Sequence, residues 1–188
     1  ETMGQQVEID RFADKGANGY VFFGRNKILN RKVAIKYYYW GSDPRLHDEP
    51  RLLSQIKSPY VIPVLDAGPV GSDWAMFQTP YCEYGDLDGM IEAKTLSTHT
   101  AIDRIIEVLT GLSVLHTSGL VHRDIKPGNI LIGNTGGAMI GDFGSVKAIS
   151  EEGRVNSVSG QSALYRPPES FSHSEYTKVS DIYQCGLV

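Results

Sequence analysis

The sequence predicts an α+β fold built in two parts, and three observations support it. Residues 7–79 alternate short runs of β-branched and aromatic residues with one helical stretch, and Trp74–Gln78 is typical of a last strand. Residues 97–116 instead carry apolar side chains at helical spacing. The chain has 188 residues, of which 41% are hydrophobic, so it can bury a sizeable core. We therefore expect a smaller β-rich part followed by a larger, mainly helical part.

Composition narrows the classes of function. The formal net charge of −4 gives no indication of a nucleic-acid-binding surface. No apolar run approaches the roughly 18 residues of a membrane span, so we expect no membrane segment in this chain. The two cysteines, Cys82 and Cys185, are too few for a disulfide framework and suit a reducing compartment. We therefore expect a cytoplasmic location.

The long helix of the second part has recognisable ends. Ser97 or Thr98 can cap its N-terminus, and Gly119 can end it. Its apolar side chains are predicted to form one face and are Ile102, Ile105, Ile106, Leu109, Leu112 and Leu115.

Two short segments carry most of the functional information. His122-Arg123-Asp124-Ile125-Lys126-Pro127-Gly128-Asn129 is followed by Asp142-Phe143-Gly144. Either segment alone is compatible with an ordinary acidic surface turn. In this order and at this spacing they resemble the catalytic and metal-binding loops of the eukaryotic-type (Hanks-type) protein kinases.

The resemblance implies a role for each polar side chain. Asp124 would be the catalytic base that orients and deprotonates the acceptor hydroxyl, and Lys126 would reach the γ-phosphate of ATP. Asn129 and Asp142 would hold Mg²⁺ through oxygen atoms, which this hard cation prefers.

The same resemblance extends to the β-rich part. Lys36 ends Val33-Ala34-Ile35-Lys36, an apolar run typical of a strand, and would contact the α- and β-phosphates. Gly16 and Gly19, in Gly16-Ala17-Asn18-Gly19-Tyr20-Val21, match the second half of the glycine-rich phosphate loop. Asp14 stands where the family usually has its first glycine. A plain hairpin turn is the alternative for the two glycines.

Glu49 is the candidate ion-pair partner of Lys36. Leu52, Leu53 and Ile56 follow it at helical spacing. Pro50 is tolerated mainly in the first turn of a helix, so we expect the helix to begin near Asp48 or to kink there, after a separate turn at Asp43-Pro44. A solvent-exposed glutamate at a helix start is the alternative for Glu49.

A hinge at residues 80–84 would separate a small lobe at 1–79 from part of a large lobe at 85–188. In the family, hinge backbone atoms bind adenine, apolar side chains enclose it and a carboxylate meets the ribose. The residues that match are Val21, Ala34, Thr79, Pro80, Tyr81, Cys82, Asp86 and Leu131. For the apolar residues, ordinary packing within each lobe is the alternative.

The acceptor class follows from Lys126, because a lysine two residues after the catalytic aspartate resembles serine/threonine kinases. Residues 160–169 resemble the end of an activation segment, in which Ser162 would support Asp124. The string Lys126-Pro127-Gly128 is similar to bacterial members of the family.

Regulation by phosphorylation is a further expectation. Arg123 could bind a phosphate carried by Ser157 or Ser159, although both serines could equally be loop residues without such a role.

The chain end resembles the start of the family's central large-lobe helix. Asp181 would bind the backbone at His122 and Arg123. The family pairs the residue matching Glu169 with a later arginine, and no arginine follows Arg166 here. We therefore expect the large lobe to be incomplete and its remaining segment to belong to the same polypeptide.

Taken together, the sequence predicts an ATP- and Mg²⁺-dependent protein serine/threonine kinase that acts on a protein substrate. Two alternatives stay open. One is a nucleotide-binding pseudokinase scaffold, which the intact Lys36, Asp124, Asn129 and Asp142 disfavour. Asp14 and Pro50 keep this alternative open. The other is a kinase-like small-molecule phosphotransferase, which normally lacks Arg123 and the segment from Tyr165 to Glu169.

Overall fold

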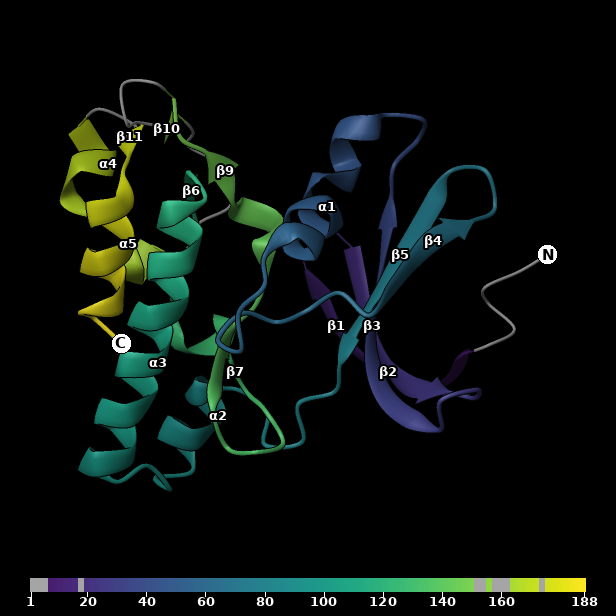
Figure 1. The fold of residues 1–188 in the computed structure, drawn as a ribbon, viewed down its shortest axis with the longest axis horizontal. Helices are drawn as coiled ribbons and strands as arrows, with labels where there is room; N and C mark the ends of the chain where they lie inside the picture. Colours follow the sequence, from purple (N-terminus) through teal and green to yellow (C-terminus); the bar gives the residue numbers. More distant parts are fainter. Residues whose placement is uncertain (1–6, 17–18, 151–154, 157–162, 173–174) are drawn as a thin grey trace. The chain divides into compact units, whose positions relative to one another are not determined.

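The fold consists of two compact units (Figure 1). The first unit comprises residues 1–57 and 63–81, and the second comprises residues 58–62 and 82–188. The prediction of an α+β, two-lobed fold with a β-rich and a mainly helical part is confirmed. This computed structural model describes residues 7–16, 19–150, 155–156, 163–172 and 175–188.

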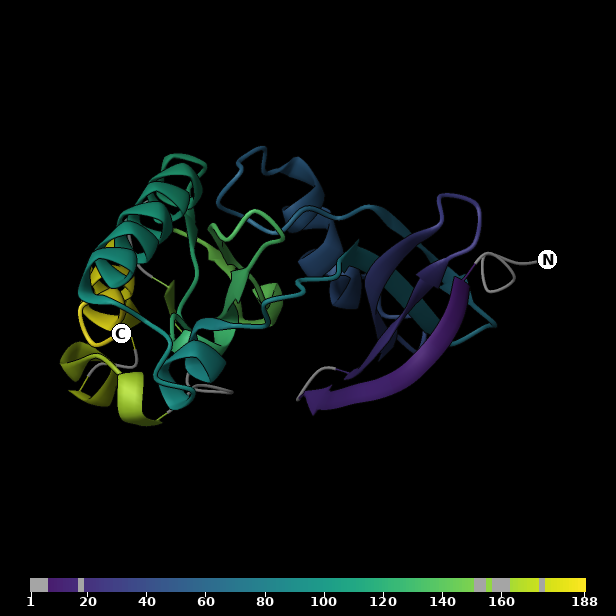
Figure 2. The same ribbon diagram turned by 90° about the horizontal axis from the view of Figure 1, so that it is seen from below.

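The first unit is built on a five-stranded antiparallel sheet with the strand order β1-β2-β3-β5-β4. Figure 2 shows β1 as the purple strand at one edge of this sheet. The predicted strand at Trp74–Gln78 is present and continues to Pro80. The strands are β1 (Val7–Gly16), β2 (Gly19–Asn26), β3 (Arg31–Tyr39), β4 (Asp66–Val70) and β5 (Trp74–Pro80).

One face of this sheet forms the core of the first unit. Val33 and Ile35 of β3 are fully buried and cluster with Val7 and Met76. Because side chains alternate between faces along a strand, Ala34 and Lys36 lie on the opposite face. The face of the sheet that carries Lys36 is therefore not the face that forms this core.

Helix α1 (Asp48–Gln55) begins where the sequence predicts. A separate turn of 3₁₀ helix, Pro44–His47, precedes it and is capped by the Asp43 side chain. Pro50 is the third residue of α1, where a backbone N–H has no partner within the helix. Pro50 therefore neither kinks nor shortens the helix, and Glu49 lies in a regular first turn.

The second unit combines four helices with three two-stranded antiparallel sheets among its described residues: β6 with β9, β7 with β8, and β10 with β11. The helices are α2 (Leu87–Glu92), α3 (Thr98–Thr117), α4 (Pro168–Ser172) and α5 (Lys178–Cys185). The strands are β6 (Leu120–Val121), β7 (Ile130–Ile132), β8 (Ala138–Ile140), β9 (Lys147–Ala148), β10 (Val155–Asn156) and β11 (Glu175–Tyr176).

Residues 58–62 belong to the second unit because their backbone bonds to β8. The amide of Ile62 donates to the carbonyl oxygen of Ile140 at 2.9 Å. The amide of Ile140 donates to the carbonyl oxygen of Tyr60, also at 2.9 Å. The sequence division had placed these residues with the small lobe.

Helix α3 has the predicted ends, but only part of the predicted apolar face is buried. The Ser97 side chain caps its first turn, and Gly119 follows its end with φ +74°. Leu112 and Leu115 are fully buried, and this part of the chain packs beside α5 and the short strands (Figure 1). The exposed members of the face are Ile102 at 53%, Ile106 at 55% and Leu109 at 37%.

Within the described part of the chain, no helix is both long enough and apolar enough to span a membrane.

We expect Gly111→Ala to destabilise the second unit, although alanine is the better helix former. A Cβ at Gly111 would lie 2.8 Å from the carbonyl oxygen of Tyr60 and 2.9 Å from Cδ1 of Ile140. Overpacking of this kind costs about 1–3 kcal/mol, more than the roughly 1 kcal/mol of helix propensity gained. Urea unfolding followed by circular dichroism measures the change in free energy.

Gly89→Ala is the matched control for this variant. Its Cβ would meet only Oδ1 of Asp86, at 3.6 Å. The control should be neutral or more stable. Equal effects of the two substitutions would contradict the steric explanation for Gly111.

Candidate active site

Asp124 lies at the centre of a buried polar cluster between β6 and β7. Only 3% of its surface is exposed. Its Oδ2 atom accepts hydrogen bonds from Nζ of Lys126 and from Nδ2 of Asn129, both at 2.9 Å. The three side chains that the sequence assigns to one loop therefore meet at one carboxylate.

Asn129 is oriented by its amide nitrogen. Nδ2 donates to Oδ2 of Asp124 and also, at 2.7 Å, to the backbone carbonyl oxygen of Asp124. Both partners are acceptors, so the atom facing them is the amide nitrogen. The side-chain oxygen Oδ1 is therefore directed away from Asp124. This oxygen is the type of ligand that Mg²⁺ prefers, so the donor set fits the predicted metal.

Asp142 introduces the Asp-Phe-Gly turn in the left-handed conformation, with φ +50°, and its side chain is exposed. The turn is anchored by Phe143, which is 1% exposed and packs edge-on against the ring of His122 at 5.4 Å. Nε2 of His122 donates to the carbonyl oxygen of Gly141 at 3.0 Å. The histidine therefore links the segment that holds Asp124 to the segment that holds Asp142.

Asp181 binds the backbone at His122 and Arg123, as the sequence predicts. Oδ2 accepts from the amide of His122 at 2.9 Å, and Oδ1 accepts from the amide of Arg123 at 2.8 Å. Nε2 of His116 is a third partner, 2.8 Å from Oδ2. Asp181 is fully buried, so these contacts act without competing water.

Gln184 is a structural residue that sequence reasoning missed. Its Oε1 accepts from the amide of Ile125 and its Nε2 donates to the carbonyl oxygen of Arg123, both at 3.1 Å. The two backbone groups flank Asp124, so one buried side chain fixes the chain on both sides of the carboxylate. The only available signal was its position three residues after Asp181, on the same face of α5.

Arg123 is strained and almost fully buried. Its φ is +71°, and Nε donates to the carbonyl oxygen of Ser145 at 2.6 Å. Burial lowers the pKa of its guanidinium from the usual value, and nearby Tyr176 opposes that shift. Within the described ranges, its Nη1 has no hydrogen-bond partner. The predicted phosphorylation sites, Ser157 and Ser159, lie outside those ranges, as does Ser162.

In the first unit, the predicted ion pair between Lys36 and Glu49 is present. Nζ of Lys36 lies 2.7 Å from Oε1 and 2.8 Å from Oε2 of Glu49. The side chains are 14% and 12% exposed, so the exposed-glutamate alternative does not apply.

Four of the candidate phosphate and adenine residues of the first unit share one face of its sheet. Val21 lies opposite Lys36 in the β2–β3 register, and Ala34 lies opposite Thr79 in the β3–β5 register. Directly opposed residues point to the same face, so these four side chains line the face away from the core. Pro80 is opposite buried Val33 and so lies on the other face.

Gly16 and Gly19 pair directly across β1 and β2. A Cβ at Gly19, where φ is +151°, would lie 2.2 Å from the carbonyl oxygen of Tyr37, so only glycine fits. Asp14 lies opposite Val21 and is exposed, and its Oδ1 accepts from the amide of Lys15 at 2.7 Å. The loop residues between the glycines lie outside the described ranges.

The remaining candidate nucleotide-binding residues, Cys82, Asp86 and Leu131, belong to the second unit. Asp86 caps α2 by accepting from the amide of Gly89 at 2.9 Å, and it forms a β-bridge with Leu131. Cys82 is the first residue after the division between the units. Burial raises the pKa of its thiol to about 11, so it stays protonated at neutral pH.

Glu169 bonds to a residue of α5 within the described part of the chain. Its Oε1 accepts from Oγ of Ser180 at 2.6 Å, and Ser180 is fully buried at the start of α5. Arg166 binds Ser170 instead, through both the hydroxyl and the backbone carbonyl at 2.9 Å. The segment that ends at Glu169 is therefore linked directly to α5, whose Asp181 binds the backbone at His122 and Arg123.

Comparison with known proteins agrees with this geometry. Residues 10–188 match the family described as "Protein kinase domain". The relatives include serine/threonine-protein kinase drp72 of Corynebacterium efficiens, which is 32% identical over all of this chain, and PknH of Mycobacterium bovis, 30% identical over 96% of it. PknA of Mycobacterium tuberculosis is 30% identical over all of this chain. The chain spans 38%, 31% and 46% of these three relatives.

We expect Gln184→Ala to destabilise the second unit strongly. The substitution leaves the buried amide of Ile125 and the buried carbonyl of Arg123 without partners, at about 1–3 kcal/mol for each group. Gln55→Ala, at the exposed end of α1, is the matched control and should change the free energy of unfolding by less than about 0.5 kcal/mol. Urea unfolding measures both. A Gln184→Ala variant as stable as the control would contradict the assigned role.

Proposed function

Because the chain belongs to the protein kinase domain family, we propose that it is a protein serine/threonine kinase that transfers the γ-phosphoryl group of ATP to a hydroxyl. One observation carries the proposal. The buried carboxylate of Asp124 is held by Lys126 and Asn129 at 2.9 Å each, within a backbone fixed by Asp181. A carboxylate held in this way can orient an acceptor hydroxyl and accept its proton.

Lys126 has two effects at this carboxylate. Its side chain is 31% exposed, so it reaches solvent while its ammonium group stays paired with Asp124. It therefore places positive charge where a transferred phosphoryl group would approach the acceptor. The lysine at this position also supports serine or threonine as the acceptor.

Asn129 and Asp142 would hold Mg²⁺ through oxygen atoms. The metal would neutralise the charge that develops on the phosphate oxygens during transfer. The Asn129 amide is already oriented by its two bonds to Asp124, so little ordering is needed when a cation binds.

Lys36 would bind the α- and β-phosphates, and its pairing with Glu49 positions the ammonium group. Gly16 and Gly19 would let the backbone approach the phosphates closely. Val21, Ala34 and Leu131 would enclose adenine, and Pro80 and Cys82 would contribute backbone atoms of the hinge. Thr79 would lie at the entrance to the back pocket, and Asp86 would meet the ribose. A hinge at residues 80–84 is supported by one of the boundaries between the two compact units, which falls between Tyr81 and Cys82.

We also propose a cytoplasmic location and a protein substrate. Both cysteines are free thiols, as expected in a reducing compartment. The kinase names of the bacterial relatives support a protein acceptor.

We expect Asp124→Asn to reduce phosphoryl transfer by about 10²- to 10⁴-fold while ATP binding is retained, because the amide cannot accept the proton. Transfer from radiolabelled ATP to a generic protein acceptor measures activity, and a thermal-shift titration measures binding. Asp88→Asn, at an exposed position of α2, is the matched control and should keep wild-type activity. An Asp124→Asn variant as active as this control would refute the proposed catalytic base.

We expect Asp142→Ala to remove the Mg²⁺-dependent part of nucleotide binding. In the unsubstituted chain, ATP with Mg²⁺ at about 100 times the dissociation constant should add roughly 2.7 kcal/mol of stability. Thermal-shift titrations with ATP alone and with ATP and Mg²⁺ separate the two contributions. Equal stabilisation of both chains by ATP with Mg²⁺ would overturn the metal assignment.

A further inference from the structure

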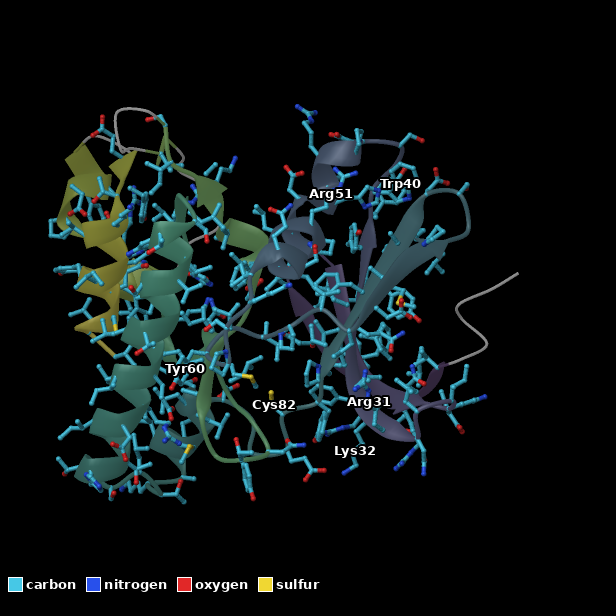
Figure 3. All side chains as sticks on the ribbon, in the orientation of Figure 1. Arg31, Lys32, Trp40, Arg51, Tyr60 and Cys82 are labelled. Carbon is cyan, nitrogen blue, oxygen red and sulfur yellow. The ribbon has the colours of Figure 1, made fainter. Side chains whose placement is uncertain are left out.

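The hairpin that joins β2 to β3 concentrates positive charge in an acidic chain. From Lys15 to Ser42 the sequence contains no aspartate or glutamate, although the whole chain has a net charge of −4. Most of the cations in this stretch belong to the hairpin, at Arg25, Lys27, Arg31 and Lys32. Figure 3 labels Arg31 and Lys32 where β3 begins.

The tip of the same hairpin is apolar and exposed. Ile28 is 69% exposed and Leu29 is 57% exposed, and both lie in the turn between the strands. Lys27 precedes them and Arg31 follows shortly after, both exposed. Two adjacent large aliphatic side chains enclosed by cations differ from the scattered single apolar residues of ordinary surfaces.

The turn holds this tip in one conformation. Asn26 is 7% exposed, and its Oδ1 accepts from the amides of Ile28 at 3.1 Å and Leu29 at 2.9 Å. Asn30 adopts the left-handed conformation with φ +46°, and its Oδ1 accepts from Nη1 of Arg25 at 3.2 Å. The two apolar side chains are therefore presented by an ordered backbone, so little conformational entropy is lost when they bind a partner.

The charges are arranged at some cost to the hairpin. Arg25 lies directly opposite Lys32, and like charges in this relation destabilise a sheet. Lys32 is partly accommodated over the ring of Tyr81, at 5.4 Å, and Glu8 of β1 is opposite Arg25 on its other side. Even with Glu8 counted, the four cations leave a clear positive excess at this end of the sheet.

We propose that the β2–β3 hairpin, residues 25–32, docks the protein onto an anionic membrane surface. Its four cations would contact lipid phosphates, and Ile28 and Leu29 would enter the interface between headgroups and acyl chains. An anionic bilayer offers phosphates and an apolar layer together, which matches both halves of the hairpin.

Other anionic partners match only half of it. Nucleic acid would use the cations, but the tip has aliphatic rather than aromatic side chains and so offers no stacking surface for bases. An acidic peptide would likewise satisfy the charges and leave Ile28 and Leu29 in water unless it also supplied an apolar pocket. The combination therefore favours the membrane.

Co-sedimentation of the 188-residue chain with vesicles tests the charges. We expect binding to phosphatidylcholine vesicles with about 30% phosphatidylglycerol and little binding to pure phosphatidylcholine. Each cation near such a surface strengthens binding about fivefold, so Lys27→Glu with Arg31→Glu should weaken it at least about 25-fold. The control, Lys57→Glu with Lys178→Glu, makes the same change of net charge at exposed sites elsewhere and should stay within about twofold.

A second variant tests the apolar tip. Ile28→Gln with Leu29→Gln keeps every charge and both amide bonds to Asn26. In about 0.5 M salt, where charge attraction is screened, it should lose the binding that the unsubstituted chain retains. Circular dichroism melts verify that each variant is folded.

Three outcomes would overturn the proposal. They are equal losses in the hairpin and control charge variants, equal binding to vesicles with and without phosphatidylglycerol, and binding of duplex DNA or polyglutamate to the hairpin as tight as that of vesicles.

Discussion

The second unit depends on the buried carboxylate of Asp181. It accepts backbone hydrogen bonds from His122 and Arg123 and so fixes the chain immediately before Asp124. Arg123 has a positive φ, which is costly for a residue with a side chain, and the bond to its amide compensates for that strain. A charge-assisted bond in a water-free interior is strong enough for this purpose. The orientation of Asp124 and Asn129 follows from the backbone that Asp181 holds.

Gln184 and Ser180 extend this control from the same helix. Gln184 bonds to the backbone on both sides of Asp124, and Ser180 donates to Glu169 at the end of the neighbouring segment. One face of α5 thus connects two separate stretches of chain, the loop around Asp124 and the segment that ends at Glu169. Each bond is made by a side chain that is fully buried, so the loss of any one leaves polar groups without water to replace it.

In the first unit, one strand carries both buried core residues and the candidate phosphate-binding lysine. Strand alternation does this directly, with Val33 and Ile35 in the core and Lys36 on the other face. Pro50 is the reason that the sequence alone could not decide whether Glu49 pairs with Lys36. A proline is incompatible with a helix interior but not with a third helical position, and only the observed start of α1 at Asp48 distinguishes the two.

The sequence by itself determined the α+β fold, the order of its elements and the ends of α3, and it put the candidate catalytic residues in one loop, because periodicity, caps and motif spacing are local properties. Tertiary structure decided which side chains meet. Gln184 looked like any helical glutamine until α5 packed against the loop, and Ile102 lies on the predicted apolar face yet is exposed. Such contacts join residues distant in the chain, where the spacing of residue types carries no information about distance in space.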